Sequence, residues 1–137
     1  AQESRGLGDV YKRQLVDDKG KKDVRTVLRF VPRIAPIKAA IFPLLKKNEE
    51  QVRIAREIEK TLQPWMTVFY DEAGAVGRRY RRQDEVGTPF CITVDFETLG
   101  ENDPSLKDTV TIRHRDSMEQ ERVAVKDLLH WLIARVR

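Results

Sequence analysis

The sequence predicts an α/β fold in which a mixed five-stranded sheet is covered by three helices. Short apolar runs typical of buried strands alternate with helical patterns in the first part of the chain, which implies parallel strand pairing. Two runs nearer the C-terminal end are separated by a turn and indicate an antiparallel hairpin. The 137 residues, 40% of them hydrophobic and 35% charged, suffice for one compact domain with a heavily charged surface.

The first predicted βαβ unit begins at residues 37–42, an apolar run whose only charge is Lys38. Residues 48–63 follow as an amphipathic helix, because Asn48 is a suitable N-cap and apolar residues recur at helical spacing. Residues 66–70 form a second short strand that we expect to pair in parallel with the first.

The second half of the chain contains two more helices and three more strands. A helix is predicted over residues 75–85 and ends at Gly87, a residue typical of helix C-termini. A helical stripe of leucine, isoleucine and valine runs from Val125 to the C-terminus. The remaining strands are expected at residues 90–94, 109–114 and 121–125.

Residues 1–14 differ from the rest of the chain, with no amphipathic period. Asp9–Gln14 back-translates with ordinary codons to GATGTGTATAAGAGACAG, which resembles a transposon end used to prepare sequencing libraries. We therefore interpret residues 1–14 as a translated adapter, not native protein, and exclude them from the fold. The alternative is a natural flexible tail. Residues 15–33 are interpreted as a loop and linker with a short apolar segment, and residues 34–137 as the folded domain.

Composition bears on three properties of the chain: nucleic-acid binding, membrane spanning and disulfide formation. Residues 1–33 account for the whole net charge of +4, so residues 34–137 are neutral overall and any nucleic-acid surface must come from local clustering. No apolar run approaches the roughly 18–20 residues that span a bilayer. The single cysteine, Cys91, cannot form an internal disulfide, which fits a reducing, cytoplasmic location.

No catalytic or metal-binding constellation is visible in the residues. His114 and His130 lie on different predicted elements without further ligands at metal spacing, so neither is expected to bind metal. The two glycines Gly74 and Gly77 lack the lysine and hydroxyl residue of a phosphate-binding loop. The sequence therefore predicts no catalytic residue, metal or cofactor in this chain.

An arginine-rich segment is the strongest sign of function. Four arginines surround Tyr80 near the end of the second helix: Arg78, Arg79, Arg81 and Arg82. Such a cluster is suited to phosphates or unpaired bases, and Arg113 and Arg115 on a later strand are expected to extend it. The alternative is a solvated helix face partly neutralised by Asp84 and Glu85.

The same segment, RRYRRQDEVGTPFCITVD over residues 78–95, resembles the corresponding part of dimeric-type, class II glycyl-tRNA synthetases. The resemblance continues through Asp108–Val123, and upstream through Arg25–Phe30 and Ile34–Leu44. It covers roughly residues 24–130 in the expected order and spacing. It implies an anticodon-binding domain with a five-stranded mixed sheet and three helices.

The resemblance also carries expectations about a parent enzyme. Such a parent would be a homodimer that uses ATP and magnesium to attach glycine to its tRNA. Its class II catalytic motifs are missing here, and only the last stretch of a catalytic domain, about Val24–Phe30, is expected within residues 15–33. The fragment alone is therefore not expected to aminoacylate, and its expected partners are the anticodon loop of glycine tRNA and the missing catalytic domain.

By the same resemblance, tRNA-binding roles are expected for seven residues. Arginines from the helix would contact phosphates and bases, Arg113 would recognise a base, and two residues after the third strand would meet a cytosine edge, since glycine anticodons end in CC. The set is Arg79, Arg81, Arg82, Glu97, Thr98, Arg113 and Arg115. Alternatively, some arginines of residues 78–82 tie the helix to acids of the catalytic body.

Three other interpretations remain open at this point. One is a binding module that reuses the fold, such as a polymerase accessory subunit, with DNA or protein partners. Another is the anticodon-binding domain of a threonyl or prolyl relative. A flavodoxin-like enzyme domain is the third, but residues 44–48 supply no glycine or hydroxyl for a phosphate-binding loop.

Overall fold

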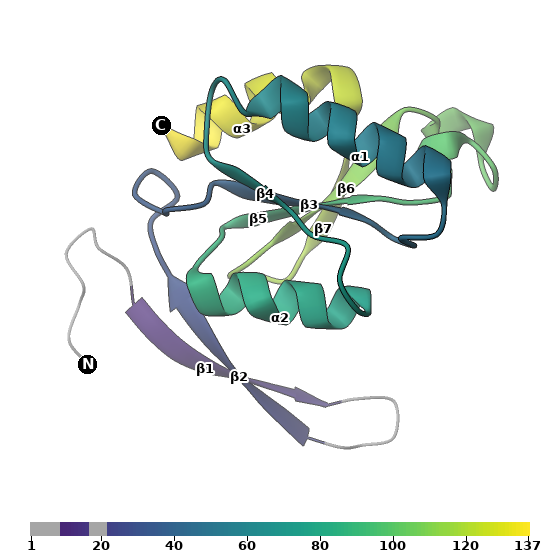
Figure 1. The fold of residues 1–137 in the computed structure, drawn as a ribbon. Helices are drawn as coiled ribbons and strands as arrows, with labels where there is room; N and C mark the ends of the chain where they lie inside the picture. The colour runs from purple at the N-terminus through teal and green to yellow at the C-terminus, as the bar shows by residue number, and fades with distance from the viewer. Residues whose placement is uncertain (1–8, 17–21) are drawn as a thin grey trace.

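The computed structural model describes residues 9–16 and 22–137 (Figure 1). Its regular elements, in chain order, are β1 (Asp9–Val16), β2 (Lys22–Arg29), β3 (Ala39–Pro43), α1 (Glu49–Leu62), β4 (Val68–Tyr70), α2 (Val76–Val86), β5 (Phe90–Val94), β6 (Thr109–His114), β7 (Gln120–Ala124) and α3 (Leu128–Val136). Single 3₁₀ turns lie at Glu97–Leu99, Pro104–Leu106 and Val125–Asp127. Within the described ranges, no helix has the length and apolar character needed to cross a bilayer.

The five-stranded mixed sheet predicted from the sequence is confirmed, with strand order β4-β3-β5-β6-β7. β3 pairs in parallel with β4 on one side and β5 on the other, whereas β5–β6 and β6–β7 are antiparallel. The strand and helix positions agree with the expected ranges to within about three residues. A second, two-stranded sheet joins β1 and β2.

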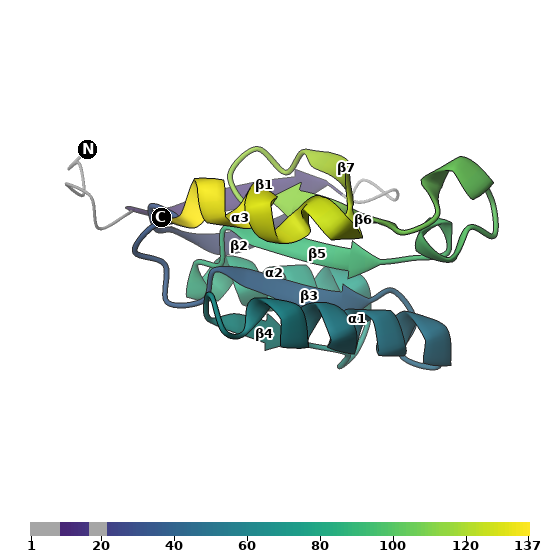
Figure 2. The same cartoon turned by 90° about the horizontal axis from the view of Figure 1, so that it is seen from above.

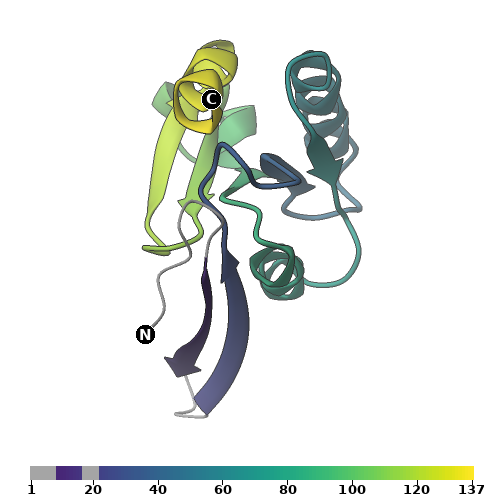
Figure 3. The same cartoon turned by 90° about the vertical axis from the view of Figure 1, so that its left-hand side faces the viewer.

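The sheet is covered differently on its two faces. α1 and α3 lie side by side on one face, and α2 and the β1–β2 hairpin lie on the other (Figures 1, 2 and 3). The main apolar core fills the α1–α3 side and includes Ile41, Ile92 and Ile112 from three central strands, together with Leu62 and Leu132 from the two helices. Because most buried apolar area lies on this side, it is the main source of stability.

α2 contacts the sheet through polar as well as apolar side chains. Its fully buried residues are Arg79, Gln83 and Asp84, and only Val76 and Tyr80 join a small apolar cluster with the sheet. The sheet contributes Ala40, Phe42 and Cys91 to that cluster. A helix with so few apolar contacts needs its buried polar groups to be hydrogen-bonded, and this requirement shapes the whole α2 side.

The N-terminal hairpin differs from the sequence expectation. The sequence predicts a loop at the start of residues 15–33 and places residues 1–14 outside the fold, but Asp9–Val16 pairs antiparallel with Lys22–Arg29. Strand pairing needs only backbone donors and acceptors in extended chain, so it arises without an apolar pattern that the sequence would reveal. The origin of residues 1–14 remains an interpretation, and residues 1–8 lie outside the described ranges.

Gly87 is where the hairpin meets α2, and its backbone conformation requires glycine. Its φ is 81°, in the left-handed region that side chains rarely adopt. A Cβ atom added there would lie 2.4 Å from Cδ2 of Phe30 and 2.8 Å from the carbonyl oxygen of Leu28. The end of β2 is therefore in direct contact with the C-terminus of α2.

Gly87→Ala should destabilise the protein by about 3 kcal/mol, because it combines left-handed strain with overpacking against Phe30. The matched control is Gly77→Ala within α2, where an added Cβ meets nothing within 4 Å. That change should be neutral or stabilising by up to about 1 kcal/mol. Urea denaturation of both variants checks the pair, and equal midpoints would contradict the packing at Gly87.

Candidate nucleic-acid interface

Two rows of side chains face α2 across the sheet. Because side chains alternate along a strand, residues paired in register share a face. One row contains Phe42, Thr93, Thr111 and Arg122, and the next contains Ala40, Cys91, Arg113 and Gln120. The rows are apolar over β3 and polar over β6 and β7, so the far half of this face is chemically suited to a polar ligand.

Arg113 is the central charged residue of this half. The residue is 4% exposed, its Nη1 lies 3.3 Å from Oδ1 of Asp84, and its guanidinium lies 4.6 Å from the centre of the Tyr80 ring. The Tyr80 hydroxyl is 2.9 Å from the Thr93 hydroxyl, and burial raises the pKa of Tyr80. An aromatic ring, a guanidinium and a carboxylate from two elements thus meet at one point.

Arg113 was expected to extend an arginine cluster suited to phosphates and bases, but it is not displayed to solvent. Its side chain is buried instead, because the helix carries the buried Asp84, which compensates the cation. The pairing joins residues 29 positions apart and depends on α2 crossing β6. The alternative interpretation, a solvated helix face partly neutralised by Asp84 and Glu85, does not hold for Asp84, which is buried.

Arg79 is also buried, at 2% exposure, and its guanidinium is bonded to backbone carbonyls. Nη1 donates to the Pro43 carbonyl at the end of β3, and Nη2 donates to the Gly74 carbonyl at 2.9 Å. These bonds join the β4–α2 turn to the end of β3. Arg79 is therefore not displayed to solvent in this structure, contrary to its expected place in an exposed patch.

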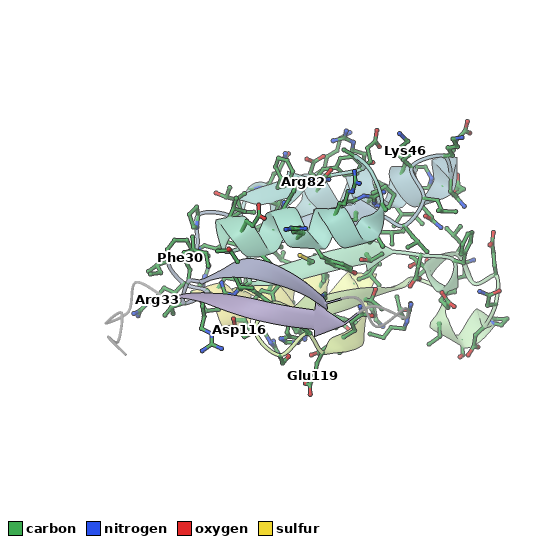
Figure 4. The ribbon with its side chains drawn as sticks, turned by 90° about the horizontal axis from the view of Figure 1, so that it is seen from below. Phe30, Arg33, Lys46, Arg82, Asp116 and Glu119 are labelled. Carbon is green, nitrogen blue, oxygen red and sulfur yellow. The ribbon has the colours of Figure 1, made fainter. Side chains whose placement is uncertain are left out.

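Arg81 and Arg82 are more accessible and lie on the outer side of α2. Arg81 is exposed and its Nε lies 3.5 Å from Oε1 of Glu85. Arg82 donates to the Asp71 carboxylate at 2.7 Å and to the Ala73 carbonyl at 2.7 Å, while almost half of its side chain remains exposed. Seen from below, Arg82 lies on the side of α2 away from the hairpin (Figure 4).

The exposed loop after β3 adds two cations that sequence analysis did not assign to the site. Lys46 and Lys47 are exposed, and they line a cavity of about 490 Å³ together with the start of α2. Lys46 lies along the same margin of the molecule as Arg82 (Figure 4). Two adjacent lysines after a buried strand were the available signal in the sequence.

Glu97 and Thr98 were expected to meet a cytosine edge. Thr98 is buried and holds the turn after β5: its backbone N–H and hydroxyl donate to the Asp95 carboxylate at 3.1 and 3.0 Å. Glu97 is partly exposed and accepts from Nδ2 of Asn102 at 3.3 Å. The polar groups of Thr98 are thus used within the turn, and of these two residues only Glu97 has a polar side chain near solvent.

Arg122 was missed by the sequence analysis. It lies on β7 opposite Thr111, and its guanidinium bonds the Asp95 carboxylate and donates to the Thr109 hydroxyl at 2.9 Å. Its position on the face of Arg113 follows from alternation along β6 and β7, which could have revealed it. Tyr80, Thr111, Arg113, Gln120 and Arg122 are together called the polar face below.

Arg115, which was expected to extend the arginine patch, is buried at 3% exposure. It donates to the carbonyls of Gly87 and Phe30 at 2.8 and 2.6 Å, and to both oxygens of Asp116. Burial raises the pKa of Asp116, but the guanidiniums of Arg115 and Arg29 lower it more, so it lies below its usual value. Arg115 is thus a packing residue here.

The other chemically reactive groups have local partners. Burial raises the pKa of the Cys91 thiol to about 12, so it is protonated at neutral pH. Nε2 of His114 lies 2.7 Å from Oε2 of Glu121, and its ring packs edge-on to Phe90 and Trp131. Among the described residues, no group of three histidine, cysteine or acidic residues could hold a metal ion.

Comparison with known proteins decides the family. Residues 38–135 match the family model described as an anticodon binding domain. The chain belongs to the anticodon-binding domain family. It is 49% identical over 126 residues to the glycine–tRNA ligase of Alkaliphilus oremlandii and 53% identical over 120 residues to that of Bifidobacterium longum. These alignments cover 92% and 86% of this chain.

The chain spans only about a quarter of the length of those ligases, 25% and 23%. A solved prolyl-tRNA synthetase from Cryptosporidium parvum shares the fold, with a TM-score of 0.69 and 21% identity over 88% of this chain and 29% of that one. Structural likeness at this identity supports the fold alone. The sequence-based assignment to the glycyl type of anticodon-binding domain is confirmed by the relatives.

The buried pair of this domain should respond strongly to single substitutions. Arg113→Ala removes the cation that lies 3.3 Å from the buried Asp84, and Asp84→Ala removes that carboxylate from the buried Arg113, so each should cost about 3–5 kcal/mol. Arg113→Met combined with Asp84→Leu should cost less than the sum of the single changes, because both charges of the pair are removed together. Urea denaturation measures all three variants, and additive costs would contradict the coupling of the pair.

Proposed function

We propose that this chain recognises the anticodon loop of glycine tRNA through the polar face, as part of a longer enzyme that attaches glycine to tRNA. The observation that carries the proposal is the meeting of Tyr80, Arg113 and Asp84 on the α2 side of the sheet. Unpaired bases in RNA loops are recognised by aromatic and arginine stacking and by hydrogen bonds to base edges.

The chemistry of the polar face fits a cytosine-containing anticodon. A carboxylate accepts from the cytosine amino group, and a guanidinium donates to base acceptors. Asp84 and Arg113 provide both groups within one pair, while Thr111, Gln120 and Arg122 add polar groups along the neighbouring strand. Because the pair is buried, base contact requires the elements that cover it to move.

Phosphate contacts are assigned to cations that are already accessible. Arg81 and Arg82 lie on α2, and Lys46 and Lys47 lie on the loop beside its start. Phosphate contacts supply affinity and fix the orientation of RNA, whereas base contacts supply specificity. Glu97, partly exposed at the end of β5, is retained as a second acceptor for a cytosine amino group.

The parent enzyme is proposed on the named relatives. About half the residues are identical to glycine–tRNA ligases of several bacteria, which favours the glycyl type over a threonyl or prolyl type. On this basis we assign to the whole protein a homodimeric, cytoplasmic ligase that uses ATP and magnesium. Neither aminoacylation nor a cofactor is assigned to this chain by itself.

Binding of the whole chain to a glycine tRNA transcript tests the proposal. Replacing either anticodon cytosine should weaken binding by about 10-fold or more, since one lost base contact costs about 1–3 kcal/mol. Gln120→Ala, at an exposed position of the polar face, should reduce this discrimination. Equal binding to all transcripts by folded protein would contradict anticodon recognition.

The same assay separates phosphate contacts from base contacts. Arg81→Gln should weaken binding to every transcript alike and reduce the slope of log affinity against log salt by about 1. The control is Lys60→Gln, an exposed change on α1 across the sheet, which should alter neither. A larger loss of tRNA binding in Lys60→Gln than in Arg81→Gln would contradict binding of RNA on the α2 side of the sheet.

A further inference from the structure

A buried guanidinium joins the base of the β1–β2 hairpin to the domain. Nη2 of Arg115 donates to the Phe30 carbonyl at 2.6 Å, and Nη1 donates to the Gly87 carbonyl at 2.8 Å. Phe30 follows the last residue of β2, and Gly87 is the C-cap of α2. One planar group therefore joins the incoming chain to the end of α2 and to the end of β6.

A second set of contacts holds that guanidinium in place. Nε of Arg115 donates to Oδ1 of Asp116 at 2.9 Å, and Nη2 donates to Oδ2 at 3.1 Å. The backbone N–H of Arg115 donates to the Pro89 carbonyl at 3.0 Å. A bidentate pair of this kind fixes orientation as well as distance.

Two further contacts cross from β2 to the domain at the same place. Nε of Arg29 lies 3.3 Å from Oδ1 of Asp116, so Asp116 is shared by an arginine on each side. The Phe30 ring packs so closely on Gly87 that no Cβ fits between them. In Figure 4, Phe30 and Asp116 lie together at one end of the hairpin.

The attachment is also adjacent to the polar face. Arg115 lies two residues beyond Arg113, and Gly87 lies three residues beyond Asp84, with the Gly87 N–H donating to the Asp84 carbonyl at 3.3 Å. The two residues that hold β2 thus lie on the same two segments as the Arg113–Asp84 pair. Displacement of β2 would act on the segments that position this pair.

We propose that Arg115 is a positioning residue that makes the junction of β2, α2 and β6 a rigid joint. The joint fixes the orientation of the chain entering the domain relative to the polar face. It consists of Arg29, Phe30, Gly87, Arg115 and Asp116. The role of this joint goes beyond RNA recognition. The joint is tested without RNA, so failure of the joint can be distinguished from failure of the proposed function.

Distance measurement between two spin labels tests the joint in the whole chain. The labels are attached to Thr26→Cys on β2 and Lys60→Cys on α1, both at exposed positions, while the buried Cys91 should remain unlabelled. The parent pair should give one narrow distance distribution. Arg115→Gln, which removes the charge and the donor fork, should broaden it at least twofold.

Arg122→Gln is the control, because it also removes an arginine that pairs with a carboxylate, Asp95, although the Arg122 side chain is less buried than that of Arg115. It should lower the thermal midpoint while leaving the distance distribution narrow. Arg115→Lys keeps the charge without the planar fork, so the width of its distance distribution should lie between those of the parent and of Arg115→Gln. The lysine variant also replaces the glutamine variant if the latter does not fold.

Three outcomes would overturn the joint. The parent distribution could already be broad, the Arg115 variants could remain as narrow as the parent, or Arg122→Gln could broaden the distribution as much as Arg115→Gln. In the last case the broadening would reflect general loosening of the sheet. Circular dichroism melting of every variant establishes that the measured samples are folded.

Discussion

The α2 side of the sheet depends on burying three arginines without leaving any of their charges unmatched. Arg79, Arg113 and Arg115 are each at most 4% exposed, and an unpaired buried charge would cost several kcal/mol. Arg113 is matched by a carboxylate, Arg79 by carbonyls, and Arg115 by both. Because hydrogen bonds require a short distance and a near-linear donor angle, these bonds fix where α2 lies on the sheet more narrowly than its few apolar contacts do.

The two faces of the sheet therefore have different roles: one mainly stabilises the fold, and the other mainly positions polar groups. The α1–α3 face is packed with aliphatic side chains and supplies most of the buried apolar area. On the α2 face much of the buried area is polar. These polar groups fix the position of α2 but contribute less net stability than the apolar groups of the α1–α3 face. That division is suited to recognition of RNA, since a rigid apolar layer supports polar groups whose geometry has to be maintained.

Most of the sheet was predictable because its strands are short apolar runs between clear turn residues, as at residues 90–94. The arginine segment was harder to interpret, since Arg79 and Arg81 are nearly neighbours yet one is buried and the other exposed. What separates them is a backbone acceptor from a distant segment, the Pro43 carbonyl that Arg79 reaches, and backbone groups leave no mark in a sequence. The family resemblance predicted the fold and the domain correctly, but it could not show which arginines the fold uses internally.

Chemical-shift mapping tests the central claim, that the polar face is where RNA binds, most directly. An anticodon stem-loop of glycine tRNA would be titrated into the isotopically labelled chain, and backbone and side-chain resonances would be followed. The account predicts that the largest changes fall on Tyr80, Thr111, Arg113, Gln120 and Arg122, with little change on the exposed surface of α1 and α3. Changes concentrated on α1 and α3, with the polar face unaffected in a folded sample, would contradict it.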